Sequence, residues 1–439
     1  MKKVVKFGGS SLESAEQFQK VANIIHADEG RRYVVPSAPG KRNSGDTKVT
    51  DMLYKCADLA AQGKAYAKEL GKIKSRYEEI IKGLGLKVSL KADFDEIAKK
   101  LEDGAGSMYA ASRGEYLNGK VLAAYLGYEF VDAANVVRFK DEETLDPEET
   151  YRLLAEHLKE HERAVVPGFY GSLKNGKIVT FSRGGSDITG SLVARAIKAD
   201  IYENWTDVSG FMVADPRIVK NSEVIHTITY KELRELAYMG ASVMHEDATF
   251  PVSQVGIPIN IKNTNEPEAE GTMIVAQTSK TSKYTITGIA GQKGFTSITL
   301  EKNKMNAAIG IGRKALQAFE EHGVSFEHMP SGIDTFSVIV HQDEFAKKEQ
   351  LILAQIEESC EPDHMDIDSD LALIAVVGRC MKSARGTAGR IFAALAHAHV
   401  NVKMIDQGSS ELNVIIGVSN DDFDNAIKAI YDIFVEAAL

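Results

Sequence analysis

The sequence has few of the features that mark secreted, membrane or disulfide-rich proteins. Its 439 residues include three cysteines, Cys56, Cys360 and Cys380, which lie far apart and form no CxxC pair. Such sparse usage favours a reducing compartment with buried free thiols. No apolar run approaches a membrane span, and the first apolar stretch is too short for a signal peptide. We therefore expect a cytoplasmic protein that does not bind membranes.

Positive charge is also scarce. Lys and Arg number 52 against 62 Asp and Glu, which gives a formal net charge of −10. Because nucleic-acid binding needs clustered basic residues, this balance argues against a nucleic-acid partner. It does not exclude a small anion in a locally positive pocket. A chain of 439 residues is too long for one core, so about two to four domains are expected.

Two common nucleotide-binding motifs and a metal-ligand pattern are missing from the sequence. There is no GxxxxGK[ST] P-loop, and no GxGxxG follows the first expected strand. His245 precedes Glu246 and Asp247, but no second histidine falls at a ligand spacing. We therefore predict a capped structural turn at this position and no protein-bound metal.

Two glycine-rich junctions between a strand and a helix are present instead. The first, Lys6-Phe7-Gly8-Gly9-Ser10-Ser11, follows an expected strand at 2–7 and precedes helical spacing at 13–25. The second, Arg183-Gly184-Gly185-Ser186-Asp187, follows a short apolar strand at 178–181. The free N–H groups and positive dipole end of such helices suit a phosphate. Each junction alone is compatible with a capped turn, but two in one unit favour an anion site.

Alternating strands and helices indicate an αβα sandwich with a largely parallel core sheet. Residues 49–101 form an expected helical flank, broken near 83–89, and a mobile loop is expected at 41–48. Ser112-Arg113-Gly114-Glu115 is expected just before another helix, where Glu115 faces either the helix dipole or a ligand amine. Further expected elements are strands at 33–37, 128–132 and 164–170, helices at 151–161 and 191–199, a helix starting within 239–249, and a last strand at 257–262.

The C-terminal part has a separate pattern of elements. Residues 295–368 read as β-α-β-β-α-β, and the same pattern restarts at 371 but lacks its final strand. An unassigned strand at 284–290 fills that gap. We therefore predict that the unit at 295–368 is inserted within a second unit, formed by 284–294 and 369–439.

Together these motifs resemble the aspartate kinases (aspartokinases) of the amino-acid kinase family. The resemblance covers essentially the whole length and rests on the two junctions and on Trp205-Thr206-Asp207-Val208-Ser209-Gly210 with Asp215-Pro216-Arg217. The two tail units are similar to ferredoxin-like ACT domains. No homoserine dehydrogenase portion follows, as in monofunctional members. The resemblance implies a catalytic domain at 1–283.

The resemblance implies transfer of the ATP γ-phosphoryl group to the β-carboxylate of L-aspartate. The product is 4-phospho-L-aspartate. This reaction is the first step of the lysine, threonine and methionine pathway. A carboxylate nucleophile is already ionised at neutral pH, so the enzyme needs charge neutralisation and alignment more than a base. Mg²⁺ is implied mainly on the ATP phosphates.

The resemblance also implies residue roles. Lys6 would stabilise the transferring phosphoryl group, and Asp187 would orient Lys6. Arg183 would bind the substrate α-carboxylate and Glu115 its ammonium. Further substrate-side positions are Ser37, Thr50 and Ser186. The ATP-side positions are Lys6, Gly8, Gly9, Ser10, Thr206, Asp207, Met212, Asp215 and Arg217.

Three positions depart from the family pattern. Ser242 stands where many relatives carry a phosphate-contacting lysine, and Met212 stands where an aromatic adenine neighbour is common. The loop at 41–48 is longer than in the pattern. These departures bear on nucleotide affinity more than on reaction type.

ACT units imply an amino-acid effector and self-association. Ser325, Phe326 and Glu327 match the strand that contacts an effector in relatives. Because the Glu327 carboxylate suits a lysine side chain, the expected regulation is feedback inhibition by lysine, with threonine as the rival. The expected assembly is a homodimer through the ACT units, with a tetramer as the alternative.

Two other functions fit part of the sequence. A related kinase acting on glutamate or N-acetylglutamate is disfavoured by the ACT pair and the Trp205 segment. A catalytically weak, ACT-based amino-acid-binding regulator is supported by Ser242, and the retention of Lys6, Arg183 and Asp187 opposes it.

Overall fold

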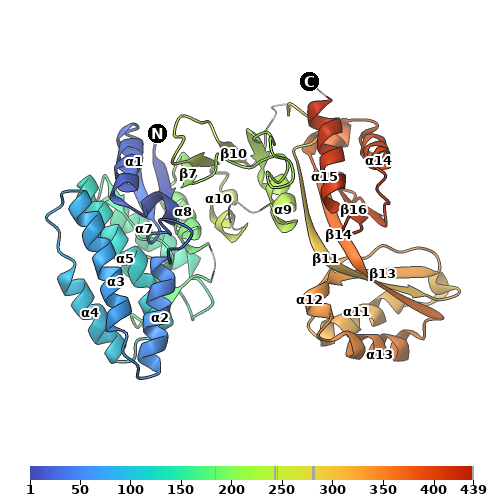
Figure 1. The fold of residues 1–439 in the computed structure, drawn as a ribbon, viewed down its shortest axis with the longest axis horizontal. Helices are drawn as coiled ribbons and strands as arrows, with labels where there is room; N and C mark the ends of the chain where they lie inside the picture. Colours follow the sequence, from blue (N-terminus) through green and yellow to red (C-terminus); the bar gives the residue numbers. More distant parts are fainter. Residues whose placement is uncertain (183, 242–243, 245, 279–281, 438–439) are drawn as a thin grey trace. The chain divides into compact units, whose positions relative to one another are not determined.

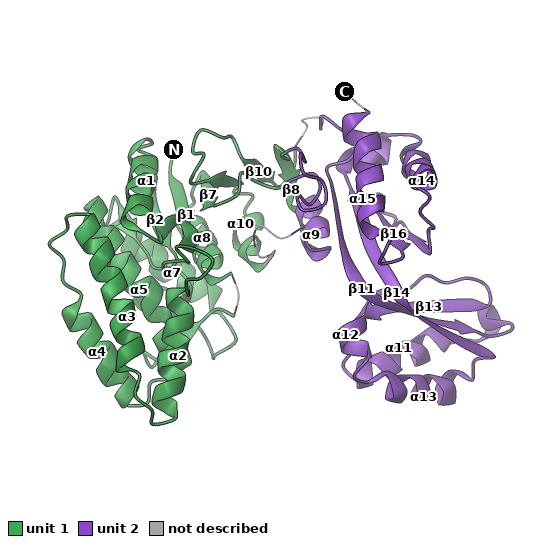
Figure 2. Ribbon diagram, in the orientation of Figure 1, with its two compact units in different colours: residues 1–211, 224–230, 243–278 green, residues 212–223, 231–242, 279–439 purple. Residues whose placement is uncertain are grey.

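The computed structural model describes residues 1–439 except 183, 242–243, 245, 279–281 and 438–439 (Figure 1). The chain divides into two compact units, coloured separately in Figure 2. Unit 1 comprises residues 1–211, 224–230 and 243–278, and unit 2 comprises residues 212–223, 231–242 and 279–439. Within these described ranges, no helix is long and apolar enough to cross a membrane.

Unit 1 is built around an eight-stranded sheet. The strand order is β3-β4-β2-β1-β7-β9-β10-β8, and all neighbouring pairs are parallel except β9 with β10. The strands are β1 Lys3–Phe7, β2 Arg31–Pro36, β3 Glu129–Phe130, β4 Ala164–Val165, β7 Ile201–Thr206, β8 Thr227–Thr229, β9 Ile259–Asn263 and β10 Thr272–Val275. The predicted, largely parallel core sheet is therefore confirmed.

Helices cover both faces of this sheet. Val5, Phe7 and Trp205 point into a core made with α1 to α5, whereas α8 packs on β1, β2 and β7 from the face to which Lys6 belongs. Since successive strand residues alternate between faces, β1 is buried on both sides, as a parallel strand requires. The helices are α1 Ala15–His26, α2 Val49–Ala61, α3 Ala67–Gly83, α4 Lys91–Glu102, α5 Ser107–Leu126, α6 Ala133–Val136, α7 Pro147–Lys159, α8 Gly185–Ala196 and α10 Phe250–Ser253.

Helix α5 corrects one sequence expectation. Residues 112–115 were expected before a helix, but α5 begins at Ser107 and runs through them. Glu115 is therefore not a first-turn partner of the helix dipole, and it lies buried in mid-helix. Gly114 occurs within the helix because a Cβ there would lie 2.8 Å from the Ala38 Cβ. The glycine reflects close packing and does not mark a helix boundary.

The short strand expected at 178–181 is present as β6 Ile178–Thr180, which pairs with β5 Tyr170–Ser172 in a separate two-stranded hairpin. One strand expectation needs correction. The strand at 257–262 is not the last of its sheet, because β10 follows it and pairs antiparallel with β9. Helix α9 Tyr230–Tyr238 was not expected from the sequence.

Unit 2 contains one six-stranded antiparallel sheet, ordered β12-β13-β11-β14-β16-β15. Expected neighbouring strands merge into two long ones, β11 Gly288–Glu301 and β14 His364–Val377 (Figure 1). The other strands are β12 Phe326–His328, β13 Thr335–His341, β15 Met404–Asp406 and β16 Asn413–Val418. The helices are α11 Ile311–Glu321, α12 Gln342–Phe345, α13 Glu349–Cys360, α14 Thr387–His397 and α15 Phe423–Tyr431.

The two long strands join two halves of this sheet. The first half of β11, up to Lys293, pairs with the segment of β14 that also pairs with β16. Its second half pairs with β13 and with the start of β14. The register shifts between Lys293 and Ser297, next to Gly294 with φ of 89°. This pairing is compatible with an inserted unit, and the exact domain boundaries stay a prediction.

Candidate active site

The predicted catalytic residues gather where the order of the parallel strands reverses. The chain passes from β1 to β2 on one side, while β7 and β9 lie on the other side of β1. Open α/β sheets bind ligands at the carboxyl ends of strands at such a switch point. Lys6 lies at the carboxyl end of β1, and Asn204 pairs beside it on β7.

Lys6 forms the centre of a buried polar cluster. It is 8% exposed, and its Nζ lies 2.5 Å from Oδ1 of Asp187. Nδ2 of Asn204 donates to the same Asp187 oxygen at 2.9 Å, and Lys6 Nζ donates to Asn204 Oδ1 at 3.4 Å. The Tyr202 hydroxyl also donates to the main-chain oxygen of Asp187 at 3.1 Å. These contacts hold the Lys6 ammonium group at the strand end, and its two side-chain partners do not use all three of its N–H donors.

Asn204 was missed by the sequence reasoning. Its signal was present, because asparagine is depleted in strands and Asn204 lies in the interior of the strand Ile201–Thr206. A buried polar residue at such a position needs partners. Only the packing of α8 against β7 shows that one of these partners is Asp187.

The first glycine-rich turn is held by close backbone contacts. Gly8 N–H donates to the Trp205 oxygen at 3.0 Å, and Gly40 N–H donates to the Gly9 oxygen at 2.8 Å. A Cβ on Gly9 would lie 2.8 Å from the Ala38 oxygen, and one on Gly40 would lie 2.6 Å from the Gly9 carbonyl carbon. Glycine is therefore required where two backbone segments meet. The predicted ATP-side residue Ser10 continues this turn in a short 3₁₀ helix, Gly9–Leu12.

The second glycine-rich turn opens α8. Gly184 is in the left-handed conformation with φ of 59°, and it provides no side chain to cap the helix. Ser186 is buried against Gly168, where a Cβ would lie 2.5 Å from the Ser186 Oγ. Phe169 has a φ of 78°, which is uncommon for a residue with a side chain. The start of α8 thus presents main-chain N–H groups beside Asp187, while Arg183 lies outside the described residues.

Glu115 is a buried carboxyl with spare bonding capacity. It is 5% exposed, and its Oε1 accepts from the Ala38 N–H at 3.0 Å. Its Oε2 has no hydrogen-bond partner among the described residues. Burial raises the pKa of Glu115 to about 8, against smaller lowering contributions from main-chain hydrogen bonds and Arg113. A buried acceptor of this kind fits a ligand ammonium group.

Other predicted substrate-side residues lie near Glu115 in the chain fold. Ser37 follows β2, where its N–H donates to the Phe7 oxygen at 3.0 Å. Asn118, one turn after Glu115, donates to the Ser37 oxygen at 2.7 Å. Thr50 lies in the first turn of α2, half-buried. Asn118 was not predicted, and no motif in the sequence pointed to it.

The predicted ATP-side residues fall in both units. Thr206 is the last residue of β7 in unit 1 and Asp207 follows it, and the Thr206 hydroxyl donates to Asp207 Oδ1 at 3.1 Å. Met212, Asp215 and Arg217 belong to unit 2. There the Arg217 side chain donates to Asp215, and this hydrogen bond lowers the pKa of the Asp215 carboxyl. Ser242 and His245 lie outside the described residues.

The predicted effector residues begin an edge strand of unit 2. Ser325 and Phe326 are exposed, and Phe326 starts β12. The Glu327 side chain is 6% exposed, and its Oε1 lies 3.5 Å from the His341 Nε2. The carboxylate expected to meet an effector therefore faces a histidine of the neighbouring strand β13.

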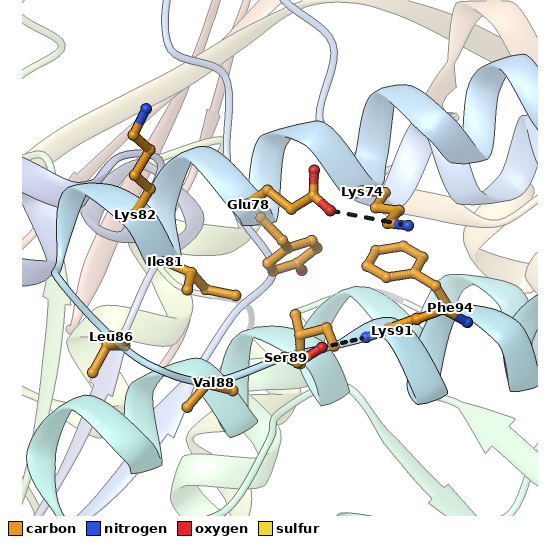
Figure 3. A pocket seen from close by; sticks show the side chains of 11 residues that line it. Lys74, Glu78, Ile81, Lys82, Leu86, Val88, Ser89, Lys91 and Phe94 are labelled. Carbon is orange, nitrogen blue, oxygen red and sulfur yellow. Dashed lines mark hydrogen bonds and ion pairs between the residues drawn. The ribbon is translucent and has the colours of Figure 1, made fainter.

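A well-formed cavity elsewhere in unit 1 contains none of the predicted residues. It measures about 500 Å³ and lies between α3 and α4 (Figure 3). Tyr77, Ile81 and Phe94 provide apolar lining, and Lys74, Lys82 and Lys91 add positive charge.

Fold and site together define a class of protein. A parallel sheet whose switch point holds a buried lysine, two glycine-rich turns and a buried carboxyl group with one unpartnered oxygen is suited to phosphoryl transfer onto a small charged molecule. The amino acid kinase family model matches residues 1–263, and an ACT domain model matches residues 374–434. Aspartokinase 3 of Bacillus subtilis (strain 168) is 42% identical over 100% of this chain and 99% of its own length.

The chain belongs to the aspartokinase family, whose members are ATP-dependent kinases that act on aspartate. Among solved structures, the aspartate kinase of Clostridium acetobutylicum has a TM-score of 0.92 at 50% identity, covering 98% of this chain and 100% of that one. Aspartokinase III of E. coli, in complex with aspartate and ADP, has a TM-score of 0.76 at 23% identity over 99% of both chains, and supports the fold alone. The family resemblance and the expected fold class are confirmed.

Proposed function

We propose that this chain transfers the γ-phosphoryl group of ATP to the β-carboxylate of L-aspartate, giving 4-phospho-L-aspartate. The observation that carries the proposal is the Lys6, Asp187 and Asn204 cluster at the sheet switch point. It places an oriented cation beside two turns with main-chain N–H groups, which is what a transferring phosphoryl group requires. The pathway role, the first step toward lysine, threonine and methionine, belongs to the same proposal.

The proposed mechanism relies on alignment and charge. The aspartate β-carboxylate is ionised at neutral pH and attacks the γ-phosphorus directly, while ADP leaves. Lys6 neutralises charge on the equatorial oxygens, and Asp187 and Asn204 keep its Nζ oriented. Gly8, Gly9 and Ser10 provide the turn that approaches the phosphates. Mg²⁺ would be held mainly by the ATP phosphates and would neutralise part of their negative charge.

The proposed substrate site recognises the two charged groups on the α-carbon of aspartate. Glu115 would accept the α-ammonium on its unpartnered Oε2, and this is supported by its burial. Arg183 would bind the α-carboxylate. Ser37, Thr50 and Ser186 complete the polar lining. A glutamate- or N-acetylglutamate-specific kinase is the second candidate, and the 42% identity to an aspartokinase disfavours it.

The proposed nucleotide site uses Thr206, Asp207, Met212, Asp215 and Arg217. Thr206 ends β7, the strand beside β1, and Asp207 follows directly.

We also propose that the chain divides into a catalytic domain at 1–283, an inserted ACT unit at 295–368, and a second ACT unit formed by 284–294 and 369–439.

The proposed regulation is feedback inhibition by lysine, with threonine as the rival effector. E. coli aspartokinase III has been solved with lysine and aspartate in a T-state and has a TM-score of 0.74 to this chain. Ser325, Phe326 and Glu327 are the proposed contacts, in a homodimer that pairs ACT units or in a tetramer of such dimers.

A coupled pair of assays tests these proposals. The intact chain is incubated with ATP, Mg²⁺ and L-aspartate, and the acyl phosphate is trapped with hydroxylamine. Parallel reactions with glutamate and N-acetylglutamate test acceptor choice. We expect hydroxamate from aspartate alone, and inhibition when lysine is added. Absence of aspartyl hydroxamate would overturn the catalytic proposal, and unchanged activity at millimolar lysine would reject the effector.

A further inference from the structure

One buried arginine on helix α3 holds both ends of the segment at 41–48. Arg76 is 3% exposed. Its Nη2 donates to the Gly40 oxygen, and its Nη1 donates to the Thr47 oxygen at 3.1 Å. The same Nη1 lies 3.3 Å from Oδ2 of Asp46. A single planar guanidinium thus bonds to the main chain at both ends of a segment that has no helix or strand.

This segment is joined directly to the first glycine-rich turn. Gly40 N–H donates to the Gly9 oxygen at 2.8 Å, and the two backbones are too close to accept a Cβ on Gly40. Ser37 precedes the segment and Thr50 follows it. The position of Gly40 therefore influences both the turn after Lys6 and the spacing of two proposed substrate-side residues.

Asp46 closes the segment from within. Its carboxylate accepts from the Arg42 N–H at 3.1 Å and from Arg42 Nε at 2.9 Å. These contacts, with the Arg42 side chain first, hold the pKa of the Asp46 carboxyl well below its usual range. Asp46 thus remains ionised and partly balances the buried Arg76 charge. Residue Arg42 also reaches Glu79 of α3 at 3.1 Å.

The next residue of α3 contacts the other side of the proposed substrate site. The Tyr77 hydroxyl donates to the Gly114 oxygen at 2.7 Å, beside Glu115. Tyr77 is also fully buried. Adjacent residues of one helix thus support the two chain segments, around 37–50 and around 115, between which aspartate is proposed to bind.

We propose that Arg76 is a positioning residue for the aspartate site, which sets the spacing between the glycine-rich turn at Gly9 and the substrate-side residues Ser37 and Thr50. The inference rests on the proposed function. Burying a guanidinium is costly compared with apolar packing of the same volume. Arg76 Nε, moreover, is buried without a hydrogen-bond partner among the described residues. The buried guanidinium is instead placed where its planar group can donate to two carbonyl oxygens at once, those of Gly40 and Thr47. A lysine ammonium group cannot reproduce this planar geometry.

Steady-state kinetics of Arg76→Ala and Arg76→Lys provide the main test. Misplacing substrate groups by about 1 Å can cost on the order of 100-fold in rate. We expect KM for aspartate to rise about 10-fold or more in R76A and less in R76K. KM for ATP should change by no more than about threefold, because the glycine-rich turn is also held by the Gly8 N–H bond to the Trp205 oxygen, which R76A leaves in place. Added methylguanidinium should restore KM for aspartate in R76A. Arg138→Ala is the matched control, because Arg138 also donates to main-chain oxygens, of Ala134 and Asn135.

A proteolysis arm separates this inference from the proposed activity. Trypsin can cut after Lys41, Arg42 and Lys48, all in the clamped segment. We expect R76A to be cleaved there at least about 10-fold faster than wild type, and R138A to be cleaved at the wild-type rate. If wild type forms no hydroxamate, the proposed function fails, and cleavage still reports on the clamp.

Two results would overturn the inference. The first is unchanged cleavage and unchanged aspartate KM in folded R76A. The second is a loss of thermal stability in R76A and R76K with aspartate KM within twofold of wild type, since that pattern indicates a purely structural arginine. If R76A does not fold, the same measurements are made on R76K and Asp46→Asn. Each of these variants keeps a positively charged side chain at position 76.

Discussion

The Lys6 Nζ lies 2.5 Å from Asp187 Oδ1 and 3.4 Å from Asn204 Oδ1. Its position therefore depends on one partner from α8 and one from β7. Lys6→Ala removes the cation, and Asp187→Ala frees it. We expect each change to lower kcat by about 10²- to 10⁴-fold, because electrostatic stabilisation dominates this chemistry. Asn204→Ala should cost about 10-fold, because Asp187 retains the direct contact. The hydroxamate assay measures all three.

The control for these variants is Lys64→Ala. Lys64 is exposed, and its Nζ bonds Gln62 in the same unit. Its kcat should match wild type. Activity unchanged in both the Lys6 and the Asp187 variants would contradict the assignment of catalytic residues.

Glu115 gives a pH dependence with a definite sign. Only its ionised form pairs with the aspartate ammonium, and burial raises its pKa to about 8. Below that pKa, aspartate binding must displace a proton. We therefore expect KM for aspartate to fall as pH rises from about 6.5 to about 8, by up to tenfold per unit, and then to level off. Glu115→Gln should show a high KM without this trend; a parallel trend in both would assign it to another group.

The same carboxyl affects the free energy of unfolding. In the folded state Glu115 keeps its proton up to about pH 8, whereas the unfolded group loses it near its ordinary value of 4.5. Between these values the folded state binds more protons, so this contribution to stability is lost as pH rises through that window. Glu115→Gln should therefore gain stability relative to wild type by about 1.4 kcal/mol per pH unit there. Urea unfolding at several pH values measures the difference, and a constant difference would contradict the raised pKa.

At the scale of elements, two turns approach so closely that only glycine fits. A Cβ on Gly40 would lie 2.6 Å from the Gly9 carbonyl carbon. Gly40→Ala should destabilise the protein by about 1–3 kcal/mol through overpacking and should lower activity, because the Gly9 turn must move. The readouts are the thermal midpoint and kcat/KM.

Gly71→Ala is the matched control for that variant. Gly71 lies inside α3 and is exposed, and a Cβ added there would have no other atom within 4 Å. Alanine at this position should stabilise the helix by up to about 1 kcal/mol without changing kinetics. Equal effects of the two substitutions on the thermal midpoint and on kcat/KM would contradict the inference that the close contact with Gly9 requires glycine at position 40.

Element boundaries were predictable only where local chemistry determines them. The strand and turn at Lys6 to Ser10 follow from alternation and the glycine pair, and the structure has them. The boundary at 112–115 was wrong, because Gly114 serves packing against Ala38, a residue 76 positions earlier in the chain. Local patterns do not encode a contact at that separation.

At the scale of the whole molecule, one antiparallel sheet in unit 2 carries the proposed effector residues. Glu327 lies in the edge strand β12, and its Oε1 is 3.5 Å from the His341 Nε2. Glu327→Ala should raise the lysine concentration for half-inhibition about 10-fold or more. It should leave kcat without lysine unchanged, because Glu327 lies in β12 and is none of the proposed catalytic, substrate-side or ATP-side residues. Lysine and threonine titrations of the hydroxamate assay measure this. Equal inhibition of variant and wild type would remove Glu327 from the effector site.

The sequence by itself determined the fold class, the phosphate-type turns and the family, because strand alternation, glycine pairs and charged residues at strand ends are local signals. It also pointed to Lys6 and Asp187, and the structure places them in contact. Only the tertiary structure decided that Asn204 joins them, that Glu115 is buried in mid-helix with a raised pKa, and that Arg76 holds the segment at 41–48. These features arise from contacts between residues far apart in the chain, where burial and distance set hydrogen bonding and charge. No local pattern specifies them.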